Sequence, residues 1–122
     1  MKYEVKQTDK FRFIEEGDGE PLVLLHGLFG ALSNFKDLIE HFRHSHRVIV
    51  PILPLFELDL FHTTVGGLEK YVHKFIETKN YYHVNLLGNS LGGHVALLHV
   101  LKHPERIKSL ILTGSSGLFE NG

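Results

Sequence analysis

The sequence predicts an α/β fold, a mostly parallel sheet with helices on both faces. After a short N-terminal hairpin, stretches with the pattern of strands alternate with stretches of helical periodicity. This alternation is typical of parallel sheets with right-handed crossover connections. The expected inner strands are also near-continuous apolar runs, which indicates strands covered on both faces. No internal repeat or domain boundary interrupts the pattern, so residues 1–122 are expected to belong to one domain.

The first expected elements are short strands. Two alternating runs, Tyr3–Gln7 and Phe11–Glu15, flank a turn at Asp9 and predict a hairpin. A segment dense in glycine and acidic residues then precedes the apolar run Leu22–Leu25, which ends at His26 and Gly27. Because this run does not alternate, we expect it to be a central parallel strand.

A helix and a second buried strand follow. Asn34 is a suitable N-terminal cap for the helix. One face of this helix has the spacing i, i+3, i+4, i+7 and carries Phe35, Leu38, Ile39 and Phe42. The next strand is expected at Arg47–Val50 and should be closed by Pro51 and Pro54, since proline cannot donate to a sheet ladder.

The remaining elements are read in the same way. Leu55–Thr63 is expected to be a loop, and a helix from near Thr64 should end at Asn80. The buried face predicted for this helix consists of Leu68, Tyr71, Val72, Phe75 and Ile76. A strand at His83–Leu87 precedes a helix at Ser90–Lys102, and a last strand is expected at Ser109–Thr113. The helix that begins at Ser90 is expected to bury Leu91, Val95, Leu98 and Leu101.

Composition excludes several classes of function. A formal net charge of −1 and a pI of about 6.8 leave no electrostatic footprint for nucleic acid or an anionic membrane. The absence of cysteine excludes disulfides and thiolate metal sites. The N-terminus lacks the apolar region of a signal peptide, and no apolar run reaches the roughly 18 residues of a membrane span. We therefore expect a cytoplasmic protein whose partner is a small molecule or another protein surface.

The strongest chemical signal is Gly-Asn-Ser-Leu-Gly-Gly, in which Gly88, Asn89, Ser90 and Gly92 fit the pattern G-x-S-x-G between a strand and a helix. In this nucleophile elbow the serine lies on a strained turn and projects above the sheet. Small residues two positions before and after it allow close backbone approach. The helix N-terminus behind it supplies unpaired N–H groups that suit an oxyanion.

A second signal follows the strand Leu22–Leu25. The turn of His26, Gly27 and Leu28 can aim a backbone N–H at a carbonyl oxygen held near the serine. Together with the N–H of Leu91, it would make an oxyanion hole. His26 is expected to support this turn structurally.

These motifs, together with the opening hairpin, resemble the α/β-hydrolase superfamily over nearly the whole chain. The Asn before Ser90 and the Gly-Gly after Leu91 look most like esterases and carbon–carbon bond hydrolases related to the meta-cleavage-product hydrolases. The resemblance implies that Ser90 is the nucleophile, that Leu28 and Leu91 supply oxyanion N–H groups, and that no cofactor is used. One departure is that the usual Asp-x-Pro-Gly-x-Gly turn is replaced by residues 52–57.

In this superfamily the catalytic residues follow the order Ser, Asp or Glu, His. No histidine follows His103 in this chain. We therefore expect residues 1–122 to be the N-terminal portion of a hydrolase domain, with the lid, the C-terminal strands and the catalytic histidine absent. Such a chain would hydrolyse a small acyl substrate only when completed. Its last strand would expose an apolar edge that pairs with a second copy or with the missing half.

Two other functions remain open on the sequence alone. The glycine-rich turn at the Ser90 helix could bind a phosphate or carboxylate in a non-catalytic module, although it lacks the lysine of a P-loop. The chain could also be an inactive hydrolase relative that acts through protein contacts. No metal site is expected, and the histidines are read as surface or helix-end residues, namely His41, His44, His46, His99 and His103.

Overall fold

The computed structural model describes residues 3–27, 35–54 and 65–114. The strands are β1 (Lys6–Thr8), β2 (Phe11–Glu16), β3 (Pro21–Leu25), β4 (Arg47–Pro51), β5 (Val84–Asn89) and β6 (Ile107–Thr113). The helices are α1 (Lys36–Phe42), α2 (Val65–Lys79) and α3 (Leu91–Lys102), and a short 3-10 helix covers Pro104–Arg106. Every predicted strand and helix is present, which confirms the α/β fold class. The predicted cap Asn34 and the loop Leu55–Thr63 lie outside the described residues.

The six strands form one sheet in the order β1-β2-β4-β3-β5-β6. β1, β2 and β4 pair antiparallel, whereas β4, β3, β5 and β6 run parallel. Asp9, in the turn of the opening hairpin, has a φ of 56°. The chain moves from β3 to β4 on one side and then crosses to β5 on the other. The carboxyl ends of β3 and β5 therefore flank a topological switch point, where open α/β sheets bind their ligands.

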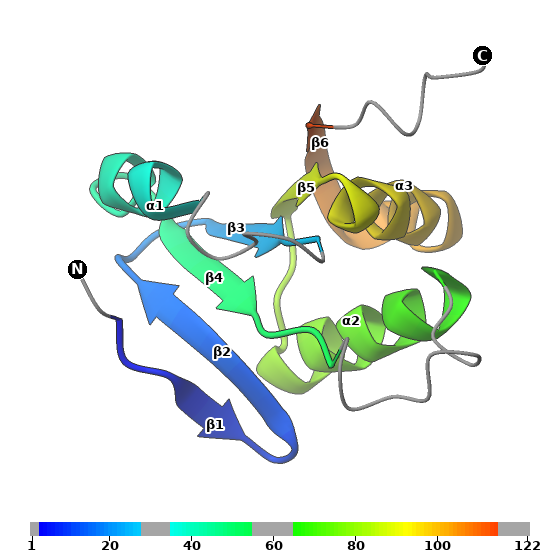
Figure 1. Cartoon of the computed structure of the whole chain (residues 1–122), viewed down its shortest axis with the longest axis horizontal. Helices are drawn as coiled ribbons and strands as arrows, with labels where there is room; N and C mark the ends of the chain where they lie inside the picture. The colour runs from blue at the N-terminus through cyan, green and yellow to red at the C-terminus, as the bar shows by residue number, and fades with distance from the viewer. Residues whose placement is uncertain (1–2, 28–34, 55–64, 115–122) are drawn as a thin grey trace.

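The inner strands bury side chains on both faces, as the continuous apolar runs predicted. Successive β3 residues alternate between two hydrophobic clusters. Val23 and Leu25 pack in the cluster that includes α2 and α3, while Leu22 and Leu24 pack in the cluster that includes α1. The molecule thus has three layers, with α1 on one side of the sheet and the other two helices on the opposite side (Figure 1). No helix in the described ranges is long and apolar enough to cross a membrane.

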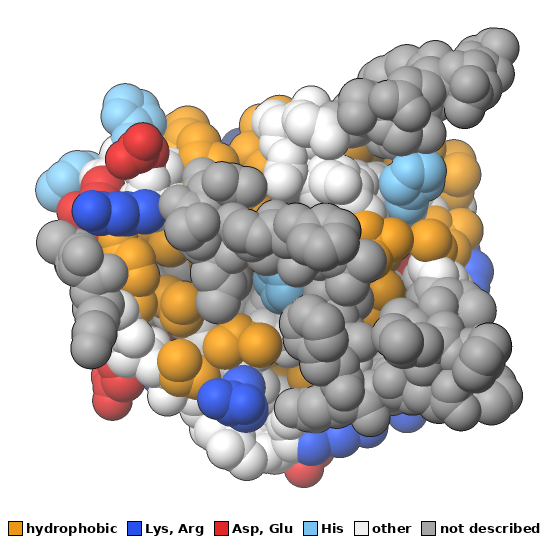
Figure 2. Space-filling view, viewed as in Figure 1, with side chains coloured by type: hydrophobic (Ala, Val, Ile, Leu, Met, Phe, Trp, Pro, Cys, Tyr) orange, Lys and Arg blue, Asp and Glu red, His pale blue; other side chains and the backbone are white. Residues whose placement is uncertain are grey.

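β4 ends at Pro51, as expected, and this proline is itself the last strand residue, opposite Phe13. One expectation about an individual residue is wrong. Leu101 was expected to be buried, yet 71% of its surface is exposed. The residues of α3 that are buried are Gly92, Gly93, Val95, Ala96 and His99. Small residues therefore face the sheet, and Figure 2 shows hydrophobic side chains left at the surface along α3.

The interpretation of the five histidines named above as surface or helix-end residues is also partly wrong. His41 and His44 are exposed, and Figure 2 shows histidine side chains gathered at the corner that α1 occupies. His99, in contrast, is completely buried. Glu69 of α2, which the sequence analysis did not single out, is 1% exposed and accepts a hydrogen bond from it. Burial of both groups requires partners, because isolated buried polar groups are costly.

Candidate active site

Ser90 lies at the sharp connection between β5 and α3, as predicted. It has φ 56° and ψ −119°, a backbone conformation that is unfavourable for a residue with a Cβ atom. Such strain costs on the order of 1–3 kcal/mol and persists only where the surroundings enforce it. The side chain of Ser90 is exposed, and its carbonyl oxygen accepts a hydrogen bond of 2.8 Å from the N–H of Gly93. We call residues 88–93 the Ser90 turn.

Close backbone contact explains the glycines on either side of Ser90. A Cβ atom on Gly88 would lie 2.4 Å from the carbonyl oxygen of Gly92. A Cβ atom on Gly92 would lie 2.1 Å from the carbonyl oxygen of Leu25, at the end of β3. Both positions therefore exclude any larger residue. The predicted spacing of small residues around Ser90 has this steric basis.

The Ser90 turn is also tied to the neighbouring strand β6. The N–H of Ser90 donates to the carbonyl oxygen of Thr113 over 3.1 Å, and the Thr113 hydroxyl donates to Oδ1 of Asn89 over 3.2 Å. Gly114 has φ 51°, and a Cβ there would lie 2.2 Å from Asn89 Oδ1. These contacts hold the strained backbone in place. The hydrogen bond from Thr113 also gives Asn89 a structural role, which its place beside Ser90 in the sequence does not predict.

The turn after β3 lies directly against the Ser90 turn. A Cβ atom on Gly27 would lie 3.3 Å from Ser90 Cβ and 3.5 Å from the backbone nitrogen of Leu91. The two sequence motifs, far apart along the chain, are therefore adjacent in space at the switch point between β3 and β5. Among the described residues, no backbone acceptor pairs with the Leu91 N–H. Leu28, the second expected oxyanion donor, lies outside the described residues.

The family model described as alpha/beta hydrolase fold matches residues 20–121. The chain belongs to the α/β-hydrolase family. An α/β-hydrolase from the metagenome of sediments of the Mar Chica lagoon in Morocco superposes with a TM-score of 0.88. It is 47% identical in sequence, and the match covers 96% of this chain and 54% of that protein.

Two curated relatives have a narrower description of function. Lipase 1 of Psychrobacter immobilis is 29% identical over 93% of this chain and 38% of its own length. The 2-hydroxy-6-oxo-6-(2'-aminophenyl)hexa-2,4-dienoic acid hydrolase of Metapseudomonas resinovorans is 33% identical over 88% of this chain and 39% of its own. The chain thus spans less than half the length of these curated relatives. Their names agree with the predicted hydrolase class.

His26 supports the site structurally in this α/β-hydrolase chain. It is buried, its Nε2 accepts a hydrogen bond of 3.0 Å from the backbone N–H of Leu53, and its Nδ1 lies 3.0 Å from the carbonyl oxygen of Gly27. Because Nε2 is an acceptor, the proton is on Nδ1, which donates to Gly27. Burial lowers the pKa of His26 from its usual 6.5, against a raising effect of the Gly27 hydrogen bond. The ring is therefore neutral, and each of its two nitrogens takes part in one hydrogen bond within the structure.

We expect His26 to make stability pH-dependent. Because its pKa is lower in the folded chain than the unfolded value of 6.5, its contribution is complete above pH 6.5 and is lost as the pH falls through the folded pKa. Urea unfolding between pH 8 and pH 5 should therefore show a smaller free energy of unfolding at the acidic end. The free energy of unfolding of His26→Gln should depend less on pH than that of the wild type. The other histidines are the same in both proteins, so their contributions cancel when the two are compared. An unchanged pH dependence in this variant would contradict the assignment.

The base and the acid of a triad are not found near Ser90 in the described part of the chain. There the Ser90 hydroxyl makes no hydrogen bond to any side chain, and His26 is committed to Leu53 and Gly27. Both ring nitrogens of His26 are therefore occupied, and His26 is not available as a base for Ser90.

Proposed function

We propose that this chain carries the nucleophile half of a serine hydrolase, with Ser90 attacking the carbonyl carbon of an ester, a thioester or an activated carbon–carbon bond. The conformation of the Ser90 turn carries the proposal. A non-glycine residue with φ 56° is exposed at the switch point, although its strain destabilises the fold. The hydrolase names of the curated relatives also favour this activity.

In the proposed reaction, a base removes the proton of the Ser90 hydroxyl as Oγ attacks the carbonyl carbon. The carbonyl oxygen then becomes an oxyanion. The N–H of Leu91 and that of Leu28 would donate hydrogen bonds to it, helped by the positive end of α3. Collapse of the tetrahedral intermediate expels the leaving group, which takes the proton from the base, and leaves an acyl group on Ser90. Water activated by the same base then releases the acid.

We also propose that residues 1–122 form the N-terminal portion of the hydrolase domain and are inactive alone. A serine without a base is a weak nucleophile. The test is a hybrid in which residues 1–114 are continued by the C-terminal part of the 47% identical Mar Chica hydrolase. The hybrid should hydrolyse members of a panel of esters and thioesters, whereas the chain alone should not. A folded hybrid that hydrolyses none of them would contradict the proposal.

The surface for completing the domain is the outer edge of β6. This strand is at one end of the described sheet, and none of its residues is fully buried. Ile111 is 45% exposed. An unpaired apolar edge is a template for another strand. We propose that it pairs with the later strands of the domain and, when these are missing, with a second copy of the chain.

We expect the isolated chain to self-associate through this edge. Replacing Ile111 by lysine puts a charge on the β6 surface and should shift sedimentation from dimers or larger species towards the monomer. Thr78→Lys, an exposed position on α2, adds the same charge elsewhere and should change nothing. A wild-type chain that sediments as a monomer at high concentration would refute the pairing.

A further inference from the structure

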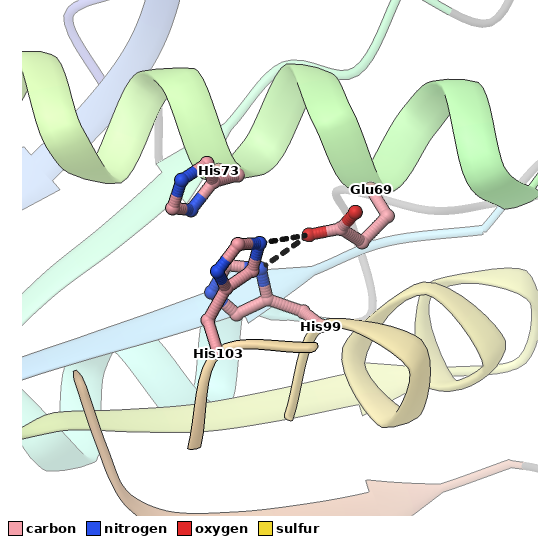
Figure 3. A group of neighbouring side chains, drawn as sticks. All are labelled: Glu69, His73, His99 and His103. Atoms are coloured by element: carbon pink, nitrogen blue, oxygen red, sulfur yellow. Dashed lines mark hydrogen bonds and ion pairs between the residues drawn. The ribbon is translucent and has the colours of Figure 1, made fainter. Parts of the chain in front are cut away.

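A group of three histidines and one glutamate joins α2 to α3 at a distance from the Ser90 turn. Glu69 and His73 are four residues apart on α2, and His99 and His103 are four residues apart at the end of α3. This spacing puts the members of each pair on the same face of a helix. Figure 3 shows all four side chains converging in the space between the two helices.

The four side chains have the dimensions of a metal shell. One ligand atom from each residue lies within 4.8 Å of the others. Oε2 of Glu69 is 2.8 Å from Nδ1 of His99 and 3.4 Å from Nε2 of His103. Tetrahedral bonds of about 2.0–2.1 Å to zinc separate the ligand atoms by roughly 3.3 Å. Small side-chain rotations would therefore be sufficient to surround an ion.

The hydrogen bonding within the cluster is incomplete. His99 is completely buried, and its Nε2 has no hydrogen-bond partner among the described residues; the buried Nδ1 of His73 has none there either. Buried polar atoms are nearly always paired, so such atoms indicate a missing group. The carboxylate of Glu69 is buried too, and Lys102 approaches it only at 3.4 Å. A further cation between the helices would compensate for these costs.

The ring of His73 stacks on that of His103 at a centroid distance of 3.6 Å with the ring planes 3° apart, so the two imidazoles are neighbours, and one ring must tilt before both in-plane lone pairs point at the same ion. A surface groove gives access to the cluster; three cluster residues, a second glutamate and three lysines line it, namely Glu69, His73, His103, Glu77, Lys70, Lys74 and Lys102. Three imidazoles and one carboxylate suit zinc, which does not require cysteine.

We propose that Glu69, His73, His99 and His103 form a zinc site that fixes α2 to α3. Four protein ligands close the coordination shell, which is typical of structural sites. The site is also far from Ser90. With a helical rise of ~1.5 Å per residue, His103 lies roughly 20 Å along α3 from Ser90. Zinc would therefore stabilise the fold without taking part in hydrolysis.

The experiment uses the untagged 122-residue chain, treated with a chelator, dialysed and titrated with zinc in a calorimeter. We expect one zinc ion per chain and, at a zinc concentration of 100 times Kd, a rise in Tm of about 5 °C or more. Cobalt at the same site should give the intense visible absorption of a tetrahedral complex. A folded chain that binds no zinc, or cobalt with only a weak octahedral spectrum, would overturn the proposal.

Matched variants locate the ion. The side chain of His103 is 24% exposed, so His103→Gln should preserve the fold while weakening zinc binding by more than about 100-fold. His44→Gln removes an exposed histidine near α1 and should bind zinc as the wild type does. Wild-type affinity in His103→Gln would contradict the assignment. If His103→Gln does not fold, the cobalt spectrum of the wild-type chain tests the proposal instead. A weak octahedral spectrum would then overturn it.

Discussion

Replacing Gly92 by alanine should strongly destabilise the fold. The added Cβ atom would lie 2.1 Å from the carbonyl oxygen of Leu25, 2.5 Å from its carbonyl carbon and 2.9 Å from the carbonyl oxygen of His26. These are backbone atoms of the central strand β3 and of the residue after it, so no side-chain rotation relieves the overlap. We expect a loss of at least ~3 kcal/mol in the free energy of unfolding, against a total of about 5–15 kcal/mol for a typical domain.

The neighbouring glycine provides the control. A Cβ atom on Gly93 would lie 3.4 Å from the carbonyl oxygen of Gly88 and 3.6 Å from Leu112, which are ordinary contacts. Gly93→Ala should therefore be neutral, or stabilise α3 by up to ~1 kcal/mol through its helix propensity. Urea unfolding of the two variants measures the difference. Equal stability would mean that α3 and β3 do not approach as closely as described.

Replacing Ser90 by alanine in the hybrid protein should reduce the turnover number for esters by at least ~10⁴-fold. The substitution removes the proposed attacking oxygen and leaves only substrate binding and the oxyanion donors. Alanine meets the same strain as serine at φ 56°, so the free energy of unfolding should stay almost unchanged. The combination of lost activity and preserved stability would separate a nucleophile from a structural cap.

Ser109 is a suitable control for this comparison. It lies on β6, where its hydroxyl donates to Oδ1 of Asn85 over 2.6 Å, away from the Ser90 turn. Ser109→Ala should keep most of the turnover number. A similar loss of activity in both variants would indicate a general effect of removing hydroxyl groups and would count against Ser90 as nucleophile.

The sheet and the Ser90 turn could be predicted because their signals are local. The continuous apolar run of Leu22–Leu25 indicates a strand covered on both faces, and the structure places β3 between two clusters. The spacing of Gly88, Ser90 and Gly92 likewise expresses contacts within one short turn and with the adjacent strand end.

The buried face of α3 could not be predicted in the same way. The periodicity favoured large residues such as Leu101, but the close approach at Gly92 selects small residues for the face towards the sheet. Leu91 packs against the core only partly buried, and Leu97 and Leu101 are exposed. Sequence periodicity reports which faces are apolar, but it contains no information on the distance between a helix and its sheet.

The cluster of Glu69, His73, His99 and His103 was missed for a related reason. Each pair has the i, i+4 spacing, which is visible in the sequence. Only the tertiary packing of α2 against α3 brings the two pairs together. The equal spacing of a Glu-His pair and a His-His pair on two successive predicted helices was the available signal.

The most direct test of the account is intact-mass spectrometry after exposure to a fluorophosphonate probe, on the hybrid protein and on the isolated chain. We expect a single adduct on the hybrid, mapped to the peptide that contains Ser90 and absent in Ser90→Ala, and an unmodified mass for the isolated chain. An adduct that persists in Ser90→Ala, or a folded and active hybrid without any adduct, would contradict the assignment of Ser90 as nucleophile.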